Sequence, residues 1–279
     1  METCRQVLPE LNFAFAKRIR KAKKLCYAIV MAKGPKAEQR RQKLYKDLIK
    51  VANEVFRMGS TCCEQLMKCH QIEALFFYQE LDHYLTLSAV AIDQCERRVL
   101  KGEKVPASEK IVSIFEEHTD IIKRGKSQSP TEFGHKVLVT TGKSGLVTQY
   151  KTFRGNPGDS GMVSDILTVH HKQYGQAPNN LCGDRRFFSS DNEKLAYKNH
   201  VKKVSICKPG YRSKARKQIE KQRWFKKLQR FRAGIEGIIS VLMRAYGLKR
   251  CLWKGWQSFQ SYVGLGIVTF NLQKIAQLT

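Results

Sequence analysis

The sequence predicts an α/β (α+β) protein, with a mixed sheet flanked by helices and a long-helix region before it. Residues 8–101 contain few turn-forming residues, and their apolar side chains recur at helical spacing. After Gly102 and Pro106, short β-branched runs alternate with helical segments, which is typical of a layer of strands covered by helices. We therefore expect a helical arm or insertion region over residues 1–101 and an α/β domain over residues 102–279.

Three long helices are expected in the first region. The first runs from about Leu11 to Met31 and carries many Lys and Arg residues around a thin apolar face. Apolar residues step by four and three along Leu44–Met58, and again along Leu81–Val99. This spacing predicts helices that pack side by side.

Three β-branched runs after the linker predict strands: Ile111–Phe115, Lys136–Thr141 and Leu146–Phe153. Residues 142–145, Gly-Lys-Ser-Gly, predict a hairpin between the last two, and they do not predict a phosphate-binding loop because a strand follows them. A turn from Gly155 then leads to Asp159 and Ser160. Either side chain is expected to cap a helix that continues to about Lys172.

A second strand–helix unit follows this helix. The short apolar run Leu181–Gly183 ends at Asp184, and a helix is expected from about Ser190. The next predicted strand is Val204–Cys207, followed by a long basic helix and an apolar terminal helix.

The charge of the chain indicates its class of partner. Lys and Arg total 51 against 24 Asp and Glu, which gives a formal net charge of +27. Nucleic acid fits this excess better than an anionic membrane, because no apolar anchor accompanies the basic residues. The apolar stretch Tyr262–Phe270 is far shorter than the roughly 20 residues of a spanning helix. The basic helix Leu11–Met31 is then a candidate DNA contact, with a solvated basic face as the alternative.

The nine cysteines are odd in number and show no repeated pair spacing. This usage indicates reduced thiols in a cytoplasm. Cys62, Cys63, Cys69 and His70 lie close in sequence, but adjacent cysteines fit a tetrahedral zinc site poorly and no second ligand pair follows. Ordinary packing of thiols between helices is expected instead.

Two acids stand where a carboxylate is costly. Asp184 ends an apolar run at the carboxyl end of a predicted strand, which is the edge where open α/β sheets place ligands. Glu236 lies in the apolar helix segment Phe231–Leu242, inside a strongly basic region. On residue pattern alone, a salt bridge to Arg232 one helical turn back is the favoured explanation of Glu236.

Several motifs occur in the order seen in one group of transposases: Ser113–Gly125, Glu132–Val137, Gly155–Ser160, Gly183–Ser189, Arg232–Glu236 and Arg244–Leu248, then Trp253–Gly255 and Val263–Val268. Over residues 105–275 the chain resembles the DDE transposases of bacterial insertion sequences. The resemblance implies a ribonuclease H-like fold for residues 102–279. It also implies metal-dependent DNA cleavage and strand transfer at the element ends.

The resemblance assigns Asp184 as the second catalytic acid and Glu236 as the third, both as ligands of two Mg²⁺ or Mn²⁺ ions. Carboxylates that hold two such cations activate water or a 3′-hydroxyl and stabilise the leaving oxygen. Arg232 matches the arginine of the family signature Tyr-x-x-Arg-x-x-x-Glu-x6-Lys. The implied partner is duplex DNA, with terminal inverted repeats and target DNA, contacted by Arg232, Arg244, Lys249, Arg250 and Lys254. The implied protein is a bacterial, nucleoid-associated one that acts as a homodimer on DNA.

The chain departs from the family pattern at several positions. Gln229 replaces the signature Tyr, Met243 replaces the signature Lys with Arg244 as a neighbouring substitute, and Arg186 stands where Gly is usual. The first acid, expected in an Asp-Thr-like motif before the helical region, is not found. An N-terminally truncated copy that lacks its first strand is therefore expected. Replacement of the missing acid is the alternative, with four candidates: Asp47, Asp82, Asp93 and Asp120.

The leading hypothesis is an incomplete DDE transposase, and whether the chain is an active enzyme stays open. The alternative is a non-catalytic DNA-binding remnant or regulator of transposition. The two differ in whether a third carboxylate reaches Asp184 and Glu236. A basic helical RNA-binding or structural protein is a third possibility that rests on charge alone, since no aromatic strand motif for RNA is present.

Overall fold

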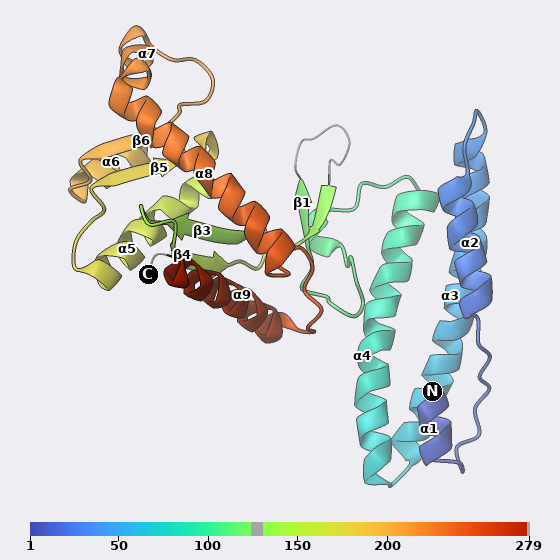
Figure 1. Cartoon of the computed structure of the whole chain (residues 1–279). Helices are drawn as coiled ribbons and strands as arrows, with labels where there is room; N and C mark the ends of the chain where they lie inside the picture. The colour runs from blue at the N-terminus through green and yellow to red at the C-terminus, as the bar shows by residue number, and fades with distance from the viewer. Residues whose placement is uncertain (124–130, 278–279) are drawn as a thin grey trace. The chain divides into compact units, whose positions relative to one another are not determined.

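The structure is a computed structural model that describes residues 1–123 and 131–277. The chain forms two compact units, Met1–Thr119 and Asp120–Thr279 (Figure 1). Each unit has its own buried apolar side chains and is described separately below.

The first unit is helical, and three long helices form as predicted. Its elements are α1 (Glu2–Val7), α2 (Ile19–Met31), α3 (Ala37–Lys68) and α4 (Ile72–Cys95), followed by a π-helical turn (Glu96–Leu100) and a 3-10 turn (Ala107–Glu109). Figure 1 shows α3 and α4 side by side as a helical hairpin. The core of the unit joins the N-terminal segment to this hairpin and consists of Cys4, Leu8, Phe13, Cys62, Leu66 and Ala74.

The predicted helix start at Leu11 is wrong, because residues 11–18 are not helical and α2 begins at Ile19. Side chains bind the backbone of this segment in place of helical hydrogen bonds. Arg5 donates to the carbonyl of Phe13, and Gln65 on α3 donates to the carbonyl of Asn12. The Phe13 ring is buried in the core of the unit, so this non-helical segment contributes an aromatic side chain to that core.

The predicted strand Ile111–Phe115 is also wrong, because these residues form no strand. The side chain of Gln94 on α4 makes both backbone hydrogen bonds of Ile111, at 2.8 and 2.9 Å. The Phe115 ring lies 5.7 Å from that of Tyr84. The segment after Lys101 therefore packs on α4, and its backbone needs no partner strand.

The second unit is an α+β structure, so the predicted class is confirmed. Among its described residues, the strands pair in three two-stranded sheets. β1 (Asp120–Lys123) pairs with β2 (Thr131–Gly134) and β3 (Val137–Thr141) pairs with β4 (Val147–Thr152), both antiparallel, whereas β5 (Asn180–Gly183) pairs with β6 (Lys203–Ile206) in parallel. The predicted hairpin at residues 142–145 and the predicted strands β3–β6 are present.

The helices of this unit include the predicted helix after the turn, the helix from Ser190 and the basic and apolar C-terminal helices. They are α5 (Val163–Tyr174), α6 (Ser190–Lys198), α7 (Lys214–Lys221), α8 (Arg223–Ala245) and α9 (Trp256–Ala276), with 3-10 turns at Asp159–Met162 and Arg185–Phe187. Ser189 caps α6 through its oxygen. The predicted cap of α5 is wrong. The Asp159 carboxylate is paired with Lys136 at 2.6 Å, and no side chain caps the N-terminus of α5 or of the 3-10 turn before it.

Helix α8 rests on two separate cores. Near its start, Phe225 is buried and the helix lies on β5 and β6, which pack with α5 and α6 around Val163, Ala196 and Val204. Near its end, Leu242 is buried against β4 and α9. Figure 1 shows α8 running from one group to the other. Within the described residues, no helix has the length and apolar character needed to cross a membrane.

Candidate functional site

The first candidate acid lies where β5 ends. Asp184 follows Gly183 directly, and its side chain accepts a hydrogen bond from the N–H of Arg185 at 2.6 Å. This contact caps the 3-10 turn Arg185–Phe187, which leads into α6. The carboxylate is therefore held at the carboxyl end of the strand and stays exposed to solvent.

A buried polar contact fixes α8 against the neighbouring strand β6. Ser205 is fully buried, and its hydroxyl donates to the carbonyl of Phe225 at 3.1 Å. The side-chain amide of Gln229 donates to the Ser205 carbonyl at 2.5 Å. Because a buried carbonyl without a partner is costly, these contacts define the position of the helix on the sheet. Gln229 thus has a structural role at the position of the signature Tyr.

One turn further along α8, Arg232 lies between the two candidate acids. Its Nη2 atom is 3.9 Å from Oδ1 of Asp184 and 3.0 Å from Oε1 of Glu236. The Arg232 side chain is 25% exposed, whereas those of Asp184 and Glu236 are 48% and 68% exposed. Ion pairs this exposed contribute about 0–1 kcal/mol each, so both carboxylates can exchange this partner for another cation.

The charge of Arg232 also affects the pKa of the Cys182 thiol on β5. Burial raises the pKa of Cys182, and the positive charge of Arg232 opposes that rise. The guanidinium lies near the carboxyl end of β5, since its Nη2 atom is 3.9 Å from Oδ1 of Asp184. The salt bridge from Arg232 to Glu236 that the residue spacing favours is present, and it extends to Asp184.

This pair of acids does not by itself fit a two-metal centre. Across residues 1–123 and 131–277, no group of three His, Cys, Asp or Glu side chains is arranged to hold a metal ion. Carboxylates are the right donors for Mg²⁺ or Mn²⁺, but two exposed ones bridged by a guanidinium leave a metal pair with too few ligands. All nine cysteines are free thiols, and Cys62 and Cys63 are buried in the first unit.

Asp120, the first candidate to replace the missing acid, is engaged elsewhere. Its carboxylate is 3.1 Å from Nδ1 of His135, which directly follows β2. The His135 ring packs against Trp256 and Phe259 on α9, with ring centroids 4.9 and 4.8 Å away. Asp47, Asp82 and Asp93 belong to the first unit, where Asp93 pairs with Arg97.

The remaining predicted DNA-binding residues are all exposed. Arg244 lies near the end of α8, and Lys249, Arg250 and Lys254 lie in the segment that joins α8 to α9. Met243 follows Glu236 by seven residues and so shares its side of the helix, whereas Arg244 points about 100° further round. Arg244 therefore does not take the place of the signature Lys on that face.

A partly buried ion-pair network close to the site was missed from the sequence. Arg216 on α7 donates to Glu193 at 2.6 Å, to Glu220 at 3.0 Å and to the carbonyl of Ile206 at 2.6 Å. Glu220 also accepts from Arg212 and from the N–H of Lys208. The four-residue spacing of Arg216 and Glu220 was the available signal, but it gave no sign of their burial.

Comparison with known proteins gives one result. The chain matches no curated protein and no solved structure. Residues 190–276, which form α6 to α9 with β6, match a family model described as a transposase DDE domain. The matched range contains Arg232, Glu236 and the four exposed basic residues above, and it begins after Asp184. From α6 to α9, the match supports a DDE transposase.

Proposed function

We propose that this protein is a DDE transposase of a bacterial insertion sequence, in which Asp184 and Glu236 are the second and third acids of the site. The observation that carries the proposal is the position of Arg232, which is within 3.9 Å of both carboxylates. The two acids are 236 − 184 = 52 positions apart in the sequence, yet they share one guanidinium. Such convergence is expected of ligands for a common cation.

The partner we propose is duplex DNA at the element ends and at the target. A net charge of +27 favours a polyanion. Arg232, Arg244, Lys249, Arg250 and Lys254 would contact phosphates and give affinity that depends little on sequence. A ribonuclease H-like arrangement of residues 102–279 and a homodimer on DNA belong to the same proposal.

Arg232 has a defined part in this proposal. It neutralises Asp184 and Glu236 while no cation lies between them, because two carboxylates facing a phosphate would otherwise repel it. With only these two acids, the chain alone should cleave DNA at a negligible rate. Loss of a ligand worth several kcal/mol in the transition state lowers a rate by orders of magnitude, since each 1.4 kcal/mol or so is tenfold.

The test compares DNA binding by Asp184→Asn and Glu236→Gln with and without Mg²⁺. In EDTA both variants should bind a fluorescent duplex more tightly than the unaltered protein, because a negative charge near the phosphates is gone. In Mg²⁺ the order should reverse, because the unaltered carboxylates then hold cations that attract the phosphates. Asp165→Asn on α5 makes the same charge change at an exposed ion pair with Lys151 and is the control.

Two results would contradict the assignment of the acids. One is that both variants respond to Mg²⁺ as Asp165→Asn does. The other concerns cleavage: if the protein nicks supercoiled DNA in Mn²⁺ and neither Asp184→Ala nor Glu236→Ala affects that activity, the acids lie elsewhere. Nicking that both substitutions abolish would instead require a third acid in this chain, and Asp120→Ala would be the next variant to assay.

The basic residues are tested separately by charge reversal. Reversal at Lys249, Arg250 and Lys254 should weaken DNA binding more than reversal at Lys101 and Lys104, which lie outside the matched region. The unaltered protein should lose affinity steeply between low and physiological salt as bound counterions are released. Equal effects of the two sets, or an affinity that is flat with salt, would refute this interface.

A non-catalytic DNA-binding remnant or regulator is the second candidate. It is favoured by the lack of a third metal-binding side chain beside Asp184 and Glu236 in the described part of the chain. In such a protein Arg232 would be a permanent partner of both acids. If the unaltered protein and both acid variants respond to Mg²⁺ in the same way while binding DNA, this function is identified.

A further inference from the structure

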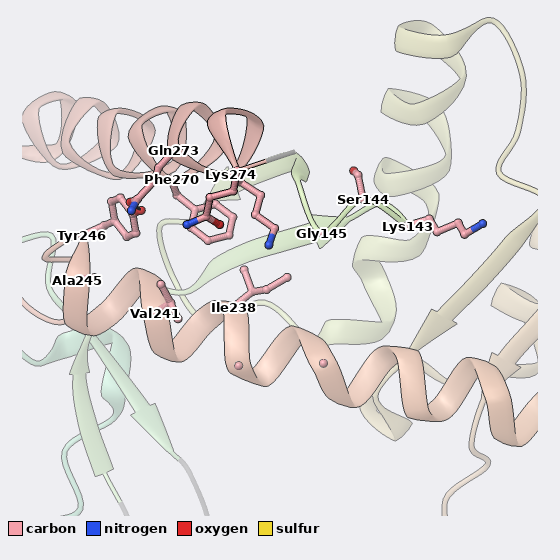
Figure 2. A pocket seen from close by; sticks show the side chains of 13 residues that line it. Lys143, Ser144, Gly145, Ile238, Val241, Ala245, Tyr246, Phe270, Gln273 and Lys274 are labelled. Carbon is pink, nitrogen blue, oxygen red and sulfur yellow. Dashed lines mark hydrogen bonds between the residues drawn. The ribbon is translucent and has the colours of Figure 1, made fainter. Parts of the chain in front are cut away.

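A cavity of about 570 Å³ lies between the β3–β4 turn, α8 and α9 (Figure 2). It is distinct from the candidate acid site. Gly234 on α8 lines the cavity, and it is two residues from both Arg232 and Glu236. Two residues turn a helix by about 200°, so the cavity side of α8 points roughly 160° away from those side chains.

The lining of this cavity is suited to an anion. It includes Lys143 from the turn and Lys274 from α9, and none of its lining residues is Asp or Glu. Figure 2 shows the Lys274 side chain reaching from α9 toward α8, while Lys143 extends outward from the turn. Gln273 accepts a hydrogen bond from Tyr246, which leaves its amide nitrogen as a further donor.

Two glycines of α8, Gly234 and Gly237, form part of the lining. The other glycines of the described α-helices lie under a neighbouring side chain: a Cβ at Gly59, Gly264 or Gly266 would lie less than 3.0 Å from it. A Cβ at Gly234 or Gly237 would meet nothing within 4 Å.

These two glycines therefore have no structural explanation within the protein. Glycine is the least favourable residue in a helix interior apart from proline, and neither position has a positive φ that would require it. A bare helix surface permits something outside the chain to approach the backbone closely. The cavity therefore has a place for a ligand that a pair of methyl groups would block.

We propose that this cavity is a groove for the sugar–phosphate backbone of a DNA strand, separate from the acid site. The inference rests on the proposed function, because that function supplies DNA as the ligand. The lysines and amide would contact phosphate oxygens, and Ile238 and Val241 would contact sugar carbons. Exposed Arg230 and Lys227 lie four and seven residues before Gly234, on the same side of α8, and extend the positive surface beyond the cavity.

The groove is tested with variants that should make the protein more stable but weaken its binding to DNA. Gly234→Ala and Gly237→Ala should each raise the melting temperature by about 2–4 °C, because alanine favours the helix and nothing inside the protein is displaced. The double variant should bind a fluorescent duplex at least tenfold more weakly. Ser261→Ala, on an exposed position of α9 outside the groove, should raise stability with no change in binding.

Charge variants give an independent readout. Lys274→Gln should lower the slope of log affinity against log salt by about 1, as expected for one lost phosphate contact. Lys172→Gln, at an exposed position of α5 away from the groove, should leave the slope unchanged. Equal slopes for the two variants would overturn the groove.

The outcomes separate this inference from the proposed function. If the alanine variants are more stable and bind DNA normally, the groove is overturned while the acid site stands. If they are less stable, the glycines are needed for packing, and the inference falls. If the unaltered protein does not bind DNA at all, both the groove and the transposase proposal are overturned.

Discussion

Replacement of Arg216 by Met should destabilise the second unit more than any other single loss of charge near the site. The Arg216 side chain is only 10% exposed, and its guanidinium makes three hydrogen bonds, to two carboxylates and to the last carbonyl of β6. It also lies over the rings of Phe188 and Phe225. Methionine keeps the apolar stem and removes the charge together with the hydrogen bonds that the guanidinium donates.

The expected loss of stability depends on the carboxylates that remain without Arg216. Removing one partner of a buried ion pair costs about 3–5 kcal/mol, since the remaining charge is uncompensated. Glu220 is 9% exposed but keeps Arg212 and the N–H of Lys208, which places the expected loss at the lower end, about 3 kcal/mol. For a unit of this size the melting temperature should fall by roughly 6–12 °C.

Urea unfolding followed by tryptophan fluorescence measures this loss, because all three tryptophans of the chain, Trp224, Trp253 and Trp256, lie in the second unit. Arg212→Met is the matched control. Its side chain is 45% exposed, and an exposed ion pair contributes about 0–1 kcal/mol. A loss below 1 kcal/mol for Arg216→Met, or equal losses for the two variants, would refute the reasoning.

Three further predictions concern the same unit. Burial alone would raise the pKa of Glu220, but its contacts with Lys208, Arg212 and Arg216 lower that pKa below the ordinary 4.5. The stability that the Glu220 carboxylate contributes is therefore complete above pH 4.5 and is lost on acidification. In a urea series, the difference in stability between Arg216→Met and the unaltered protein should shrink below about pH 4. Gln229→Leu should cost about 1–3 kcal/mol in the same assay, because it leaves the Ser205 carbonyl without its amide donor. Lys136→Met should cost about 2 kcal/mol, because Asp159 loses its partner and the Pro157 carbonyl a donor, and a stability equal to that of the unaltered protein would contradict this.

The sequence was sufficient for elements whose own pattern decides their structure. The α3 and α4 helices carry apolar residues at helical spacing over many turns, and β3 and β4 flank a Gly-rich turn. It was insufficient where side chains from other segments bind the backbone. Residues 11–18 and 111–115 lack regular structure because Arg5, Gln65 and Gln94 satisfy their carbonyl or N–H groups. Such contacts depend on residues far away in the chain, which no local pattern contains.

For the candidate site too, the sequence predicted some features and not others. The place of Asp184 at the end of a strand and the spacing of Arg232 and Glu236 could be recognised from residues, and the structure places one guanidinium near both carboxylates. The assignment of these acids to a metal site came from the family resemblance and stays a prediction. Neither the attachment of Gln229 to Ser205 nor the open surface at Gly234 could be foreseen, because each depends on how α8 lies on its neighbours.

The two cores beneath α8 have a mechanical consequence. Phe225 and Leu242 are the buried contacts near its two ends, 242 − 225 = 17 positions or about 26 Å apart, and Arg232 and Glu236 lie on the span between them. A helix held at two points bends most easily between them, and two of its residues there are glycines that add no side-chain stiffness. A ligand that presses on the face of α8 containing Gly234 and Gly237 would shift the carboxylate of Glu236 on the opposite face. Core substitutions at Leu242 or Phe270, far from either acid, should then alter the spacing of the acids as well as the stability of the fold.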